Sequence, residues 1–423
     1  MKVFKFGGAS INNIERIKNV AAIIQSYQGE KLLIIISAMG KTTNALETVA
    51  ESFFAGDQAT ALWLFDKIKA DHIEILSQLT GSPAEGYRST GLNDLFTEVE
   101  WLLHDQPVRG YDYYYDQVVC CGELLSTTII SHYLNSLGIR NEWIDVRDIF
   151  RTDDNFRDAT IDWDFTSQRV SDTVKPMFEH TNIIITQGFI GATDENESTT
   201  LGREGSDFSA AIFANMFNAA DQTIWKDVEG VMNADPKQFP DAQFISALSY
   251  QEVIEMAYYG AQVIHPKTIK PLQNKNIPLH VRCFLNPAAP GTIISGQPVH
   301  NLPPIIVLKD QQVLMELKSK DFSFVEDALA GKLHALFTAI KISPNLSQNG
   351  AITLWCCFDD RPEKIEKLAL AAGELFDVQV IRNCTLVTIR HYTDDIIEKL
   401  TSGKGQVLSQ KTSDTIQVLI QNI

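Results

Sequence analysis

Short apolar runs and longer helical periods alternate along this chain. Residues 31–37 (KLLIIIS) and 182–187 (NIIITQ) are β-branched runs, and each ends in a small-residue turn. Such runs are typical of strands that are buried on both faces of a parallel sheet. Val3, Phe4 and Phe6 form a similar apolar stretch at the start of the chain. Strands that alternate with helices predict an α/β fold in which helices sandwich a parallel-rich sheet.

Helical periods lie between these runs. Apolar residues from Ile14 to Ile24 fall on one helical face, and Ser10 or Asn12 is available as the N-cap of that helix. A second helix is expected to open at Ser206, with apolar residues on its buried side. Residues 46–110 are rich in Leu and Phe with polar breaks, which predicts a mainly helical lid or insertion.

The composition changes near Asn286, and this change predicts a domain boundary. Five prolines lie between Pro287 and Pro304, so the segment disfavours a helix and resembles a stiff connector. The length of 423 residues also exceeds the usual size of a single core. We therefore expect one domain over residues 1–296, a linker over 297–304 and a C-terminal region over 305–423.

The C-terminal region repeats a strand–helix–strand pattern. Such β-α-β units resemble small ferredoxin-like α+β modules. The predicted elements are strands at 313–317 and 351–357, helices at 325–340 and 365–375, and further strands around Val378 and Leu386. The second module is abbreviated, with one short helix at 394–400 and strands to the end of the chain.

Composition excludes several classes of partner. The chain has 53 acidic against 36 basic residues and a formal net charge of -17, which argues against a nucleic-acid-binding surface. It has no signal-peptide pattern and no run of about eighteen apolar residues, so we expect a cytoplasmic protein without a membrane span. None of the six cysteines has CxxC spacing, which predicts buried thiols and no protein-built metal site.

A glycine pair directly after the first predicted strand indicates phosphate binding. Lys5 precedes Gly7 and Gly8, and Ser10 follows them. Glycines at a strand end let backbone N–H groups approach an anion, and a helix that opens nearby adds its positive end. The order differs from a Walker loop and from a dinucleotide fingerprint. Taken alone, the motif is a weak signal, and a plain glycine turn beside an edge lysine is the favoured interpretation.

Three further clusters support a ligand site. GELLST places Glu123 near the start of an apolar helical run that begins after Cys121. TQGFIG and TTLGREGSD place Phe189 and Arg203 around a strand end and a helix N-terminus, and WKDVEGVMNADPK is another strand that ends in a polar turn. Open α/β sheets bind ligands outside the carboxyl ends of their strands, so these clusters predict one composite site.

In this order the motifs resemble those of aspartate kinases, members of the amino acid kinase superfamily. The resemblance spans residues 5–295 and rests on KFGGAS, SAMGKTTN, GELLST, QGFIG, TTLGREGSD, WKDVEG, GAQVIHP and NPAAPGT. It implies the amino acid kinase fold and transfer of the γ-phosphoryl group of ATP to the side-chain carboxylate of L-aspartate. The product would be 4-phospho-L-aspartate, at the first step toward lysine, threonine and methionine. Mg²⁺ is expected to accompany the ATP.

The resemblance also implies roles for individual residues. Lys5 would stabilise the transferred phosphoryl group, and Asp207 would hold Lys5 or the nucleotide in register. Arg203 would bind the substrate α-carboxylate, because a guanidinium matches a carboxylate bidentately, and Glu123 would receive the α-ammonium group. Each residue also has an alternative role. These roles are a surface lysine for Lys5, a plain helix cap for Asp207, a structural salt bridge for Arg203 and a solvated helix acid for Glu123. The remaining implied substrate positions are Ser37, Thr43, Phe189 and Ser206.

A second set of positions is implied for the nucleotide. The Gly7 and Gly8 backbone and Ser10 would line the phosphate oxygens together with Lys5. Many family members have Thr in place of Lys226 and Lys in place of Gln262, and the pairing in this chain is similar to that of plant-type enzymes. We therefore expect Lys226 to supply the phosphate cation that Gln262 cannot. Other nucleotide contacts are expected from Asp227, Met232 and Lys237.

The C-terminal region is similar to the paired ACT domains of aspartate kinases. It reads KDFSFVEDALAG and ISPNLSQNG where effector-binding members show a glycine-bearing loop and an acidic turn, so we expect no feedback inhibition by lysine or threonine. Dimer or higher homo-oligomer formation through this region remains expected. Because no dinucleotide-binding region follows within the 423 residues, we expect no fused homoserine dehydrogenase. The alternatives are a kinase for another acidic amino acid or a nucleotide, and a non-catalytic amino-acid sensor.

Overall fold

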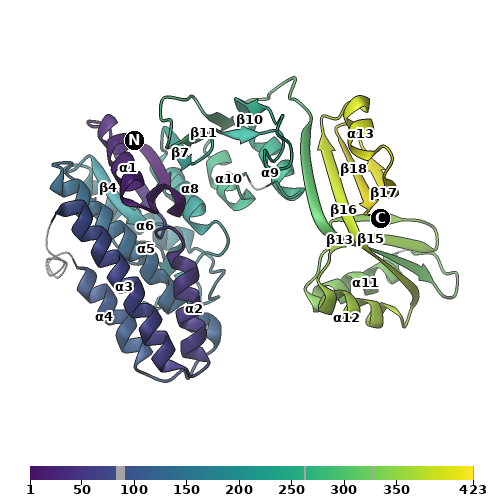
Figure 1. The fold of residues 1–423 in the computed structure, drawn as a ribbon, viewed down its shortest axis with the longest axis horizontal. Helices are drawn as coiled ribbons and strands as arrows, with labels where there is room; N and C mark the ends of the chain where they lie inside the picture. The colour runs from purple at the N-terminus through teal and green to yellow at the C-terminus, as the bar shows by residue number, and fades with distance from the viewer. Residues whose placement is uncertain (82–90, 262, 326, 423) are drawn as a thin grey trace. The chain divides into compact units, whose positions relative to one another are not determined.

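The chain forms two compact units in a computed structural model that describes residues 1–81, 91–261, 263–325 and 327–422 (Figure 1). The N-terminal unit consists of Met1–Val231, Phe244–Ile254 and Ile264–Val299. The C-terminal unit consists of Met232–Gln243, Glu255–Val263 and His300–Ile423.

A mixed, mostly parallel sheet forms the centre of the N-terminal unit. Within the described residues its spatial order is β10 (Ala247–Ser249), β12 (Thr292–Ser295), β11 (Leu279–Cys283), β7 (Asp221–Lys226), β1 (Lys2–Phe6), β2 (Leu32–Ile36), β4 (Ile183–Gln187) and β3 (Glu142–Trp143). Neighbouring strands pair in parallel except β11 and β12, which are antiparallel. All residues of β2 are buried, as the uninterrupted apolar run predicts.

Helices and short strands complete this unit. The helices are η1 (Gly8–Ile11), α1 (Ile14–Ser26), α2 (Thr42–Phe54), α3 (Gln58–Thr80), α4 (Leu92–Leu103), α5 (Tyr111–Ser136), η3 (Val146–Asp148), α6 (Trp163–Arg169), η4 (Val170–Val174), α7 (Lys175–Met177), α8 (Gly205–Phe217) and α10 (Pro266–Gln273). The short strands β5 (Ile190–Ala192) and β6 (Ser198–Thr200) pair with each other. The elements β8 (Val231–Met232), β9 (Phe244–Ile245) and α9 (Tyr250–Tyr258) lie where the chain passes between the two units.

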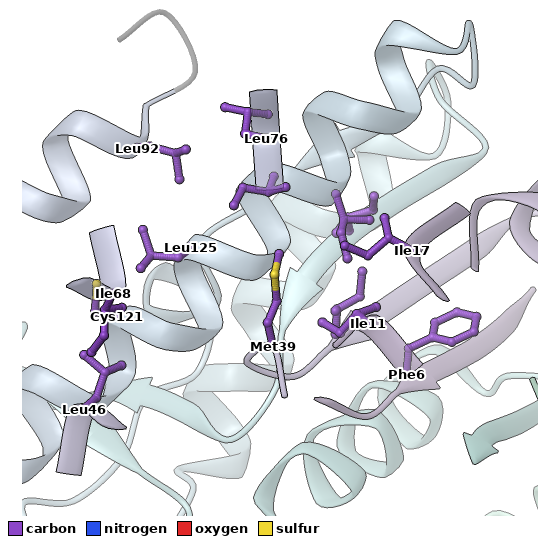
Figure 2. Packing of buried hydrophobic residues seen from close by; sticks show 14 of the residues in the cluster. Phe6, Ile11, Ile17, Met39, Leu46, Ile68, Leu76, Leu92, Cys121 and Leu125 are labelled. Atoms are coloured by element: carbon purple, nitrogen blue, oxygen red, sulfur yellow. The ribbon is translucent and has the colours of Figure 1, made fainter. Parts of the chain in front are cut away.

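One hydrophobic core joins the sheet to the helices after β2. Figure 2 shows Phe6 and Ile11 beside Ile17 of α1, and Leu46 beside Ile68 and Cys121 from three different helices. The predicted helical character of residues 46–110 agrees with α2, α3 and α4, and residues 82–90 lie outside the described part of the chain. Because this core continues from the sheet into the helices, the helices hold α5 firmly against the strands.

Two local predictions in this unit are wrong. The N-cap of α1 is Asn13, whose side chain accepts a hydrogen bond from the Arg16 N–H. The Ser10 hydroxyl instead donates a hydrogen bond to Gly7 O. Helix α5 begins at Tyr111, so Glu123 lies in mid-helix rather than near a helix start. Residues 111–121 are rich in Tyr, Val and Cys, which are modest helix formers, and burial of this stretch outweighs that low propensity.

The C-terminal unit contains an antiparallel sheet. In its described part the strand order is β14 (Leu346–Asn349), β15 (Thr353–Asp359), β13 (Ile305–Ser319), β16 (Phe376–Arg390), β18 (Thr415–Gln421) and β17 (Gly405–Lys411). Its helices are α11 (Asp327–Ile340), α12 (Pro362–Ala372) and α13 (Asp394–Thr401). The strands predicted around Val378 and Leu386 are one strand, β16, with Asn383 in the left-handed region at φ 60°.

The predicted fold class is confirmed: helices accompany a parallel-rich sheet, and α+β elements with an antiparallel sheet follow. The division at 296 and 305 remains a prediction about domains. The N-terminal unit extends to Val299, and the compact units also differ from the division in two earlier segments. Residues 232–243 and 255–263 belong to the C-terminal unit. There the Ile306 N–H donates to Asn233 O, and Ala234 packs in one apolar cluster with Val387.

Candidate active site

The N-terminal unit has an open cavity of about 450 Å³ at the carboxyl ends of β1 and β2 and at the start of α8. This is the edge of an open α/β sheet at which ligands are expected. Most of its lining comes from the motifs singled out in the sequence. The lining residues are Lys5, Gly8, Ser37, Ala38, Gly40, Thr43, Tyr115, Glu123, Arg157, Phe189, Thr200, Gly202, Arg203, Glu204, Gly205, Ser206 and Asp207.

Lys5 and Asp207 form an ion pair inside this cavity. Strand alternation buries Phe4 and Phe6 and turns the half-buried Lys5 toward the other face of the sheet. The Lys5 Nζ lies 2.7 Å from the Asp207 Oδ1, and the two side chains are 12% and 5% exposed. Asp207 stands in the first turn of α8, where a carboxylate is favoured by the helix dipole. The ammonium group is therefore fixed at a helix N-terminus.

The glycine turn after β1 brings backbone close to backbone. A Cβ atom on Gly8 would lie 2.5 Å from the Ala38 carbonyl oxygen, so no side chain fits there. The Gly40 N–H donates to Gly8 O, and the Ser10 hydroxyl donates to Gly7 O. These bonds join the turn after β1 to the turn after β2. Gly8 lines the cavity with its backbone, whereas Gly7 and Ser10 lie just beyond the lining residues.

Glu123 presents a buried carboxyl group to the cavity. Its side chain on α5 is 3% exposed and accepts a hydrogen bond from the Ala38 N–H. Burial raises the pKa of Glu123 to about 8, although the Ala38 bond and the Lys5 charge oppose the shift. Among the described residues no donor reaches the Glu123 Oε2. A buried carboxyl oxygen that lacks a partner fits a cationic or N–H-bearing ligand group.

Arg203 supplies a positive charge to the same cavity. It follows β6 in a tight loop in which Gly202 has φ 74° and Glu204 has φ 55°. Within the described part of the chain the Arg203 guanidinium makes no ion pair. The carboxylate of Glu204 instead accepts from the His265 N–H at the N-cap of α10. An unpaired guanidinium in a cavity fits an anionic ligand group.

The remaining predicted substrate positions also line the cavity. Phe189 has φ 71°, and its ring lies against Gly205, where a Cβ would come within 2.7 Å of the Phe189 Cδ2. Ser37 follows β2, and its carbonyl oxygen accepts from the Ser126 hydroxyl of α5. Thr43 lies in the first turn of α2, and Ser206 lies in the first turn of α8. The structure thus brings these positions together, and their roles remain proposals.

The predicted nucleotide residues are placed differently. Lys226 ends β7 and Asp227 follows it, and neither is among the described residues that line the cavity. Met232, the last residue of β8, and Lys237, whose N–H donates to the Asp235 carboxylate, belong to the C-terminal unit. Gln262 lies outside the described residues.

Sequence reasoning missed several lining residues, of which Tyr115 and Arg157 are the largest. The Arg157 guanidinium lies 4.2 Å from the centre of the Tyr115 ring. It also forms an ion pair with Asp112, which lies on α5 together with Tyr115. Thr200, at the end of β6, also lines the cavity. A helical period counted back from Glu123 reaches Asp116 and Tyr115 after two turns, and this signal was available in the sequence.

Asp116 lies behind these residues. Its carboxyl group is completely buried and accepts from the Thr200 N–H, the Thr200 hydroxyl and the Arg157 N–H. Burial raises the pKa of Asp116 to about 6, and the three hydrogen bonds limit the shift. The carboxyl group therefore connects α5 with two cavity walls.

Residues 1–283 match a family model that is described as the amino acid kinase family. Aspartokinase 3, chloroplastic, of Arabidopsis thaliana is 30% identical to this chain over 414 residues, which cover 94% of this chain and 68% of the relative. The chain belongs to the aspartokinase group of the amino acid kinase family.

Other relatives of the family are longer. Bifunctional aspartokinase/homoserine dehydrogenase 1, chloroplastic, of Arabidopsis thaliana is 31% identical over 421 residues, which cover 91% of this chain and 44% of the relative. The chain thus spans less than half the length of this bifunctional member. Among solved structures, E. coli aspartokinase III in complex with aspartate and ADP aligns with a TM-score of 0.83 and 25% identity, over 100% of this chain and 96% of that one.

Two findings bear on cellular context and metals. None of the described helices combines the length and apolar character that a membrane crossing requires. Within the described residues, His, Cys, Asp and Glu side chains nowhere gather in groups of three that would hold a metal ion. Several plant relatives are named as chloroplastic, and the cytoplasmic location stays a prediction.

Proposed function

We propose that this amino acid kinase family member is an aspartate kinase, an ATP-dependent phosphotransferase that converts L-aspartate to 4-phospho-L-aspartate. The observation that supports it most is one cavity with three complementary groups. Glu123 offers an unpartnered carboxyl oxygen, Arg203 an unpaired guanidinium, and Lys5 a fixed ammonium group. The first two suit the α-ammonium and α-carboxylate of an amino acid, and the third suits a phosphoryl group.

The reaction needs alignment more than acid–base chemistry. The side-chain carboxylate of aspartate has an unperturbed pKa of about 3.9 and is already ionised at neutral pH. One of its oxygens forms a bond to the γ-phosphorus while the bond from that phosphorus to the β–γ bridging oxygen breaks, and ADP leaves with the electron pair. No proton is transferred in this step.

The main barrier in such a step is repulsion between anions. The attacking carboxylate and the phosphoryl oxygens both carry negative charge, so cations and N–H donors must surround them. We assign this task to Lys5, oriented by Asp207, and to the backbone of Gly7 and Gly8 with Ser10. The close approach at Gly8, where a Cβ would meet the Ala38 carbonyl, supports a cradle of this kind. Mg²⁺ bound to ATP would add charge neutralisation to the phosphate chain.

Further nucleotide contacts are proposed from the resemblance. Lys226 would contact the phosphates of MgATP, with Asp227 beside it. Met232, Lys237 and Gln262 complete the proposed nucleotide set. Ser37, Thr43, Phe189 and Ser206 are proposed to surround the aspartate, which the shared cavity supports.

The setting of the enzyme is proposed with the activity. We infer a homo-oligomer that forms through the ACT-like region at 305–423, a linker at 297–304 and a catalytic domain at 1–296. The enzyme would act in the cytoplasm at the first step of lysine, threonine and methionine biosynthesis. Relatives named as aspartokinases, and the structure of E. coli aspartokinase III in complex with aspartate and ADP, support the choice of substrate.

A hydroxamate assay tests this proposal. MgATP and hydroxylamine are supplied with L-aspartate, L-glutamate or N-acetylglutamate, and the acyl phosphate is trapped as a hydroxamate. We expect product with L-aspartate alone, at least about 1000-fold less with Lys5→Ala, and an unchanged rate with Lys18→Ala, a control at an exposed position of α1. Product with another acid would name a different kinase. Binding of aspartate without product would instead identify an amino-acid sensor.

A further inference from the structure

Asp116 is a buried carboxylate that the proposed reaction does not use. It lies on α5 with no exposed surface, and within the described residues it forms no ion pair. Its Oδ2 accepts from the Arg157 N–H at 2.9 Å and from the Thr200 N–H at 2.8 Å. Its Oδ1 accepts from the Thr200 hydroxyl at 2.8 Å. Three donors from two other segments thus converge on one carboxyl group.

Both segments form walls of the cavity. Thr200 and Arg157 line it directly, and only Leu201 and Gly202 separate Thr200 from Arg203. On the other side, Asp116 precedes Glu123 by two helical turns of α5. The carboxylate therefore links the helix that carries Glu123 to the strand end that leads to Arg203.

The loop between Thr200 and Arg203 is short and tightly packed, so it can transmit a displacement. The Leu201 N–H donates to Phe189 O, and a Cβ on Gly202 would lie 2.6 Å from an Asp158 side-chain oxygen. Because this loop is closely packed, a displacement of Thr200 would also displace Arg203.

We propose that Asp116 is a positioning residue for the amino acid substrate, because it fixes the strand end before Arg203 relative to Glu123. This inference rests on the proposed function. Asp116 would set the distance between Arg203, which binds the α-carboxylate, and Glu123, which binds the α-ammonium group. Asp116 itself does not touch the substrate.

The energetics favour this role over a purely stabilising one. Burial of an unpaired carboxylate is costly, and the rise in the pKa of Asp116 to about 6 reflects that cost. An apolar residue would hold α5 in the core at a lower cost. What a carboxylate adds is the ability to accept several hydrogen bonds with defined directions, which suits the fixing of two chain segments.

Steady-state kinetics of Asp116 variants test the inference. Asp116→Ala removes the acceptor for all three donors, and we expect the KM for L-aspartate to rise about 10-fold to 100-fold, as for a misplaced substrate contact. The KM for MgATP should stay within about twofold. Asp116→Asn should keep the KM for L-aspartate within about threefold, because its oxygen can accept both N–H groups and its amide can donate to the Thr200 hydroxyl.

Two further variants separate positioning from general damage. Thr200→Val removes one donor and should raise the KM for L-aspartate about threefold to tenfold, a result that stands even where Asp116→Ala does not fold. Ser131→Ala removes another hydrogen bond of α5, to the half-buried Asn141 side chain, and should lower thermal stability without changing either KM. An unchanged KM for L-aspartate in both Asp116→Ala and Thr200→Val would overturn the proposal. A parallel rise of both KM values would also overturn it.

Failure of the proposed function would look different. Wild-type protein that forms no hydroxamate with L-aspartate would contradict the kinase assignment. The calorimetric Kd for L-aspartate, measured with the same variants, would still show whether Asp116 controls binding of the amino acid.

Discussion

Glu123 is a carboxyl group whose charge depends on what occupies the cavity. Burial raises its pKa to about 8, so at pH 7 it holds a proton while no ligand is bound beside it. An ammonium group beside its Oε2 favours the ionised form. Binding of an amino acid at this position is therefore coupled to release of a proton.

This coupling gives a pH prediction. The Kd for L-aspartate should fall about tenfold per pH unit as the pH rises from 6 toward 8, and it should level off above about 8. Isothermal titration at pH 7 in two buffers of different ionisation enthalpy should show release of one proton. With Glu123→Gln the binding should be weak, and its enthalpy should not depend on the buffer. A buffer-independent enthalpy for the wild type would contradict the coupling.

The same residue lowers stability at alkaline pH. The folded-state pKa of Glu123 lies above its ordinary value of 4.5, so the folded protein binds the extra proton between about pH 4.5 and 8. Protonation of Glu123 makes its full contribution to the free energy of unfolding below about pH 4.5. This contribution is lost as the pH rises through about 8. Glu123→Gln should therefore raise the thermal midpoint relative to wild type at pH 8.5 and much less at pH 5. Scanning calorimetry at the two pH values measures this, and an equal difference at both would contradict it.

Residues inside contiguous motifs could be predicted, and residues joined across long separations could not. Lys5, Glu123 and Arg203 stand in motifs with a readable chemistry, and all three line the cavity. Asp116 acquires its role only from Arg157 and Thr200, which are 41 and 84 residues away. Nothing in a local pattern specifies such a pairing, because it depends on which segments the fold brings together.

At the scale of elements, the glycine turn between β1 and η1 is the tightest constraint on the site. Gly8→Ala would place a methyl group 2.5 Å from the Ala38 carbonyl oxygen, which must then move. We expect kcat/KM to fall about 100-fold or more, because the turns after β1 and β2 separate, while circular dichroism remains native. Gly331→Ala is the control, since open space surrounds Gly331 in α11 and alanine favours a helix. Full activity of Gly8→Ala would contradict this account.

Periodicity predicted the existence of most elements and failed where packing overrides propensity. β2 and β4 lie within their predicted runs because an uninterrupted apolar segment suits a strand that is buried on both faces. The start of α5 was missed because Tyr, Val and Cys residues obscure a helical period when nearly every side chain is buried. β16 was divided in two because its middle residues are polar and exposed.

At the scale of the whole molecule, the C-terminal unit carries the proposed self-association. Phe322 and Phe324 are 70% and 63% exposed in the segment between β13 and α11, an arrangement that favours burial against a second copy. We expect sedimentation velocity to give at least a dimer for the wild type and a shift toward monomer for Phe322→Ser with Phe324→Ser. Leu370→Ser, at an exposed position of α12, is a control for the loss of surface apolar area. A monomeric wild type would contradict the proposal.

The order of residues in the C-terminal unit has a consequence for synthesis. Ala234 and Phe239 pack in a cluster with residues of β16 and β18, strands that are synthesised much later than they are. Until those strands are synthesised, these apolar side chains lack part of their cluster, while the sheet of the N-terminal unit can already assemble. A nascent chain that stalls before residue 376 would leave them partly uncovered. Quality-control factors that bind exposed apolar segments would thus have a marker that separates chains stalled before β16 from chains that already contain β18.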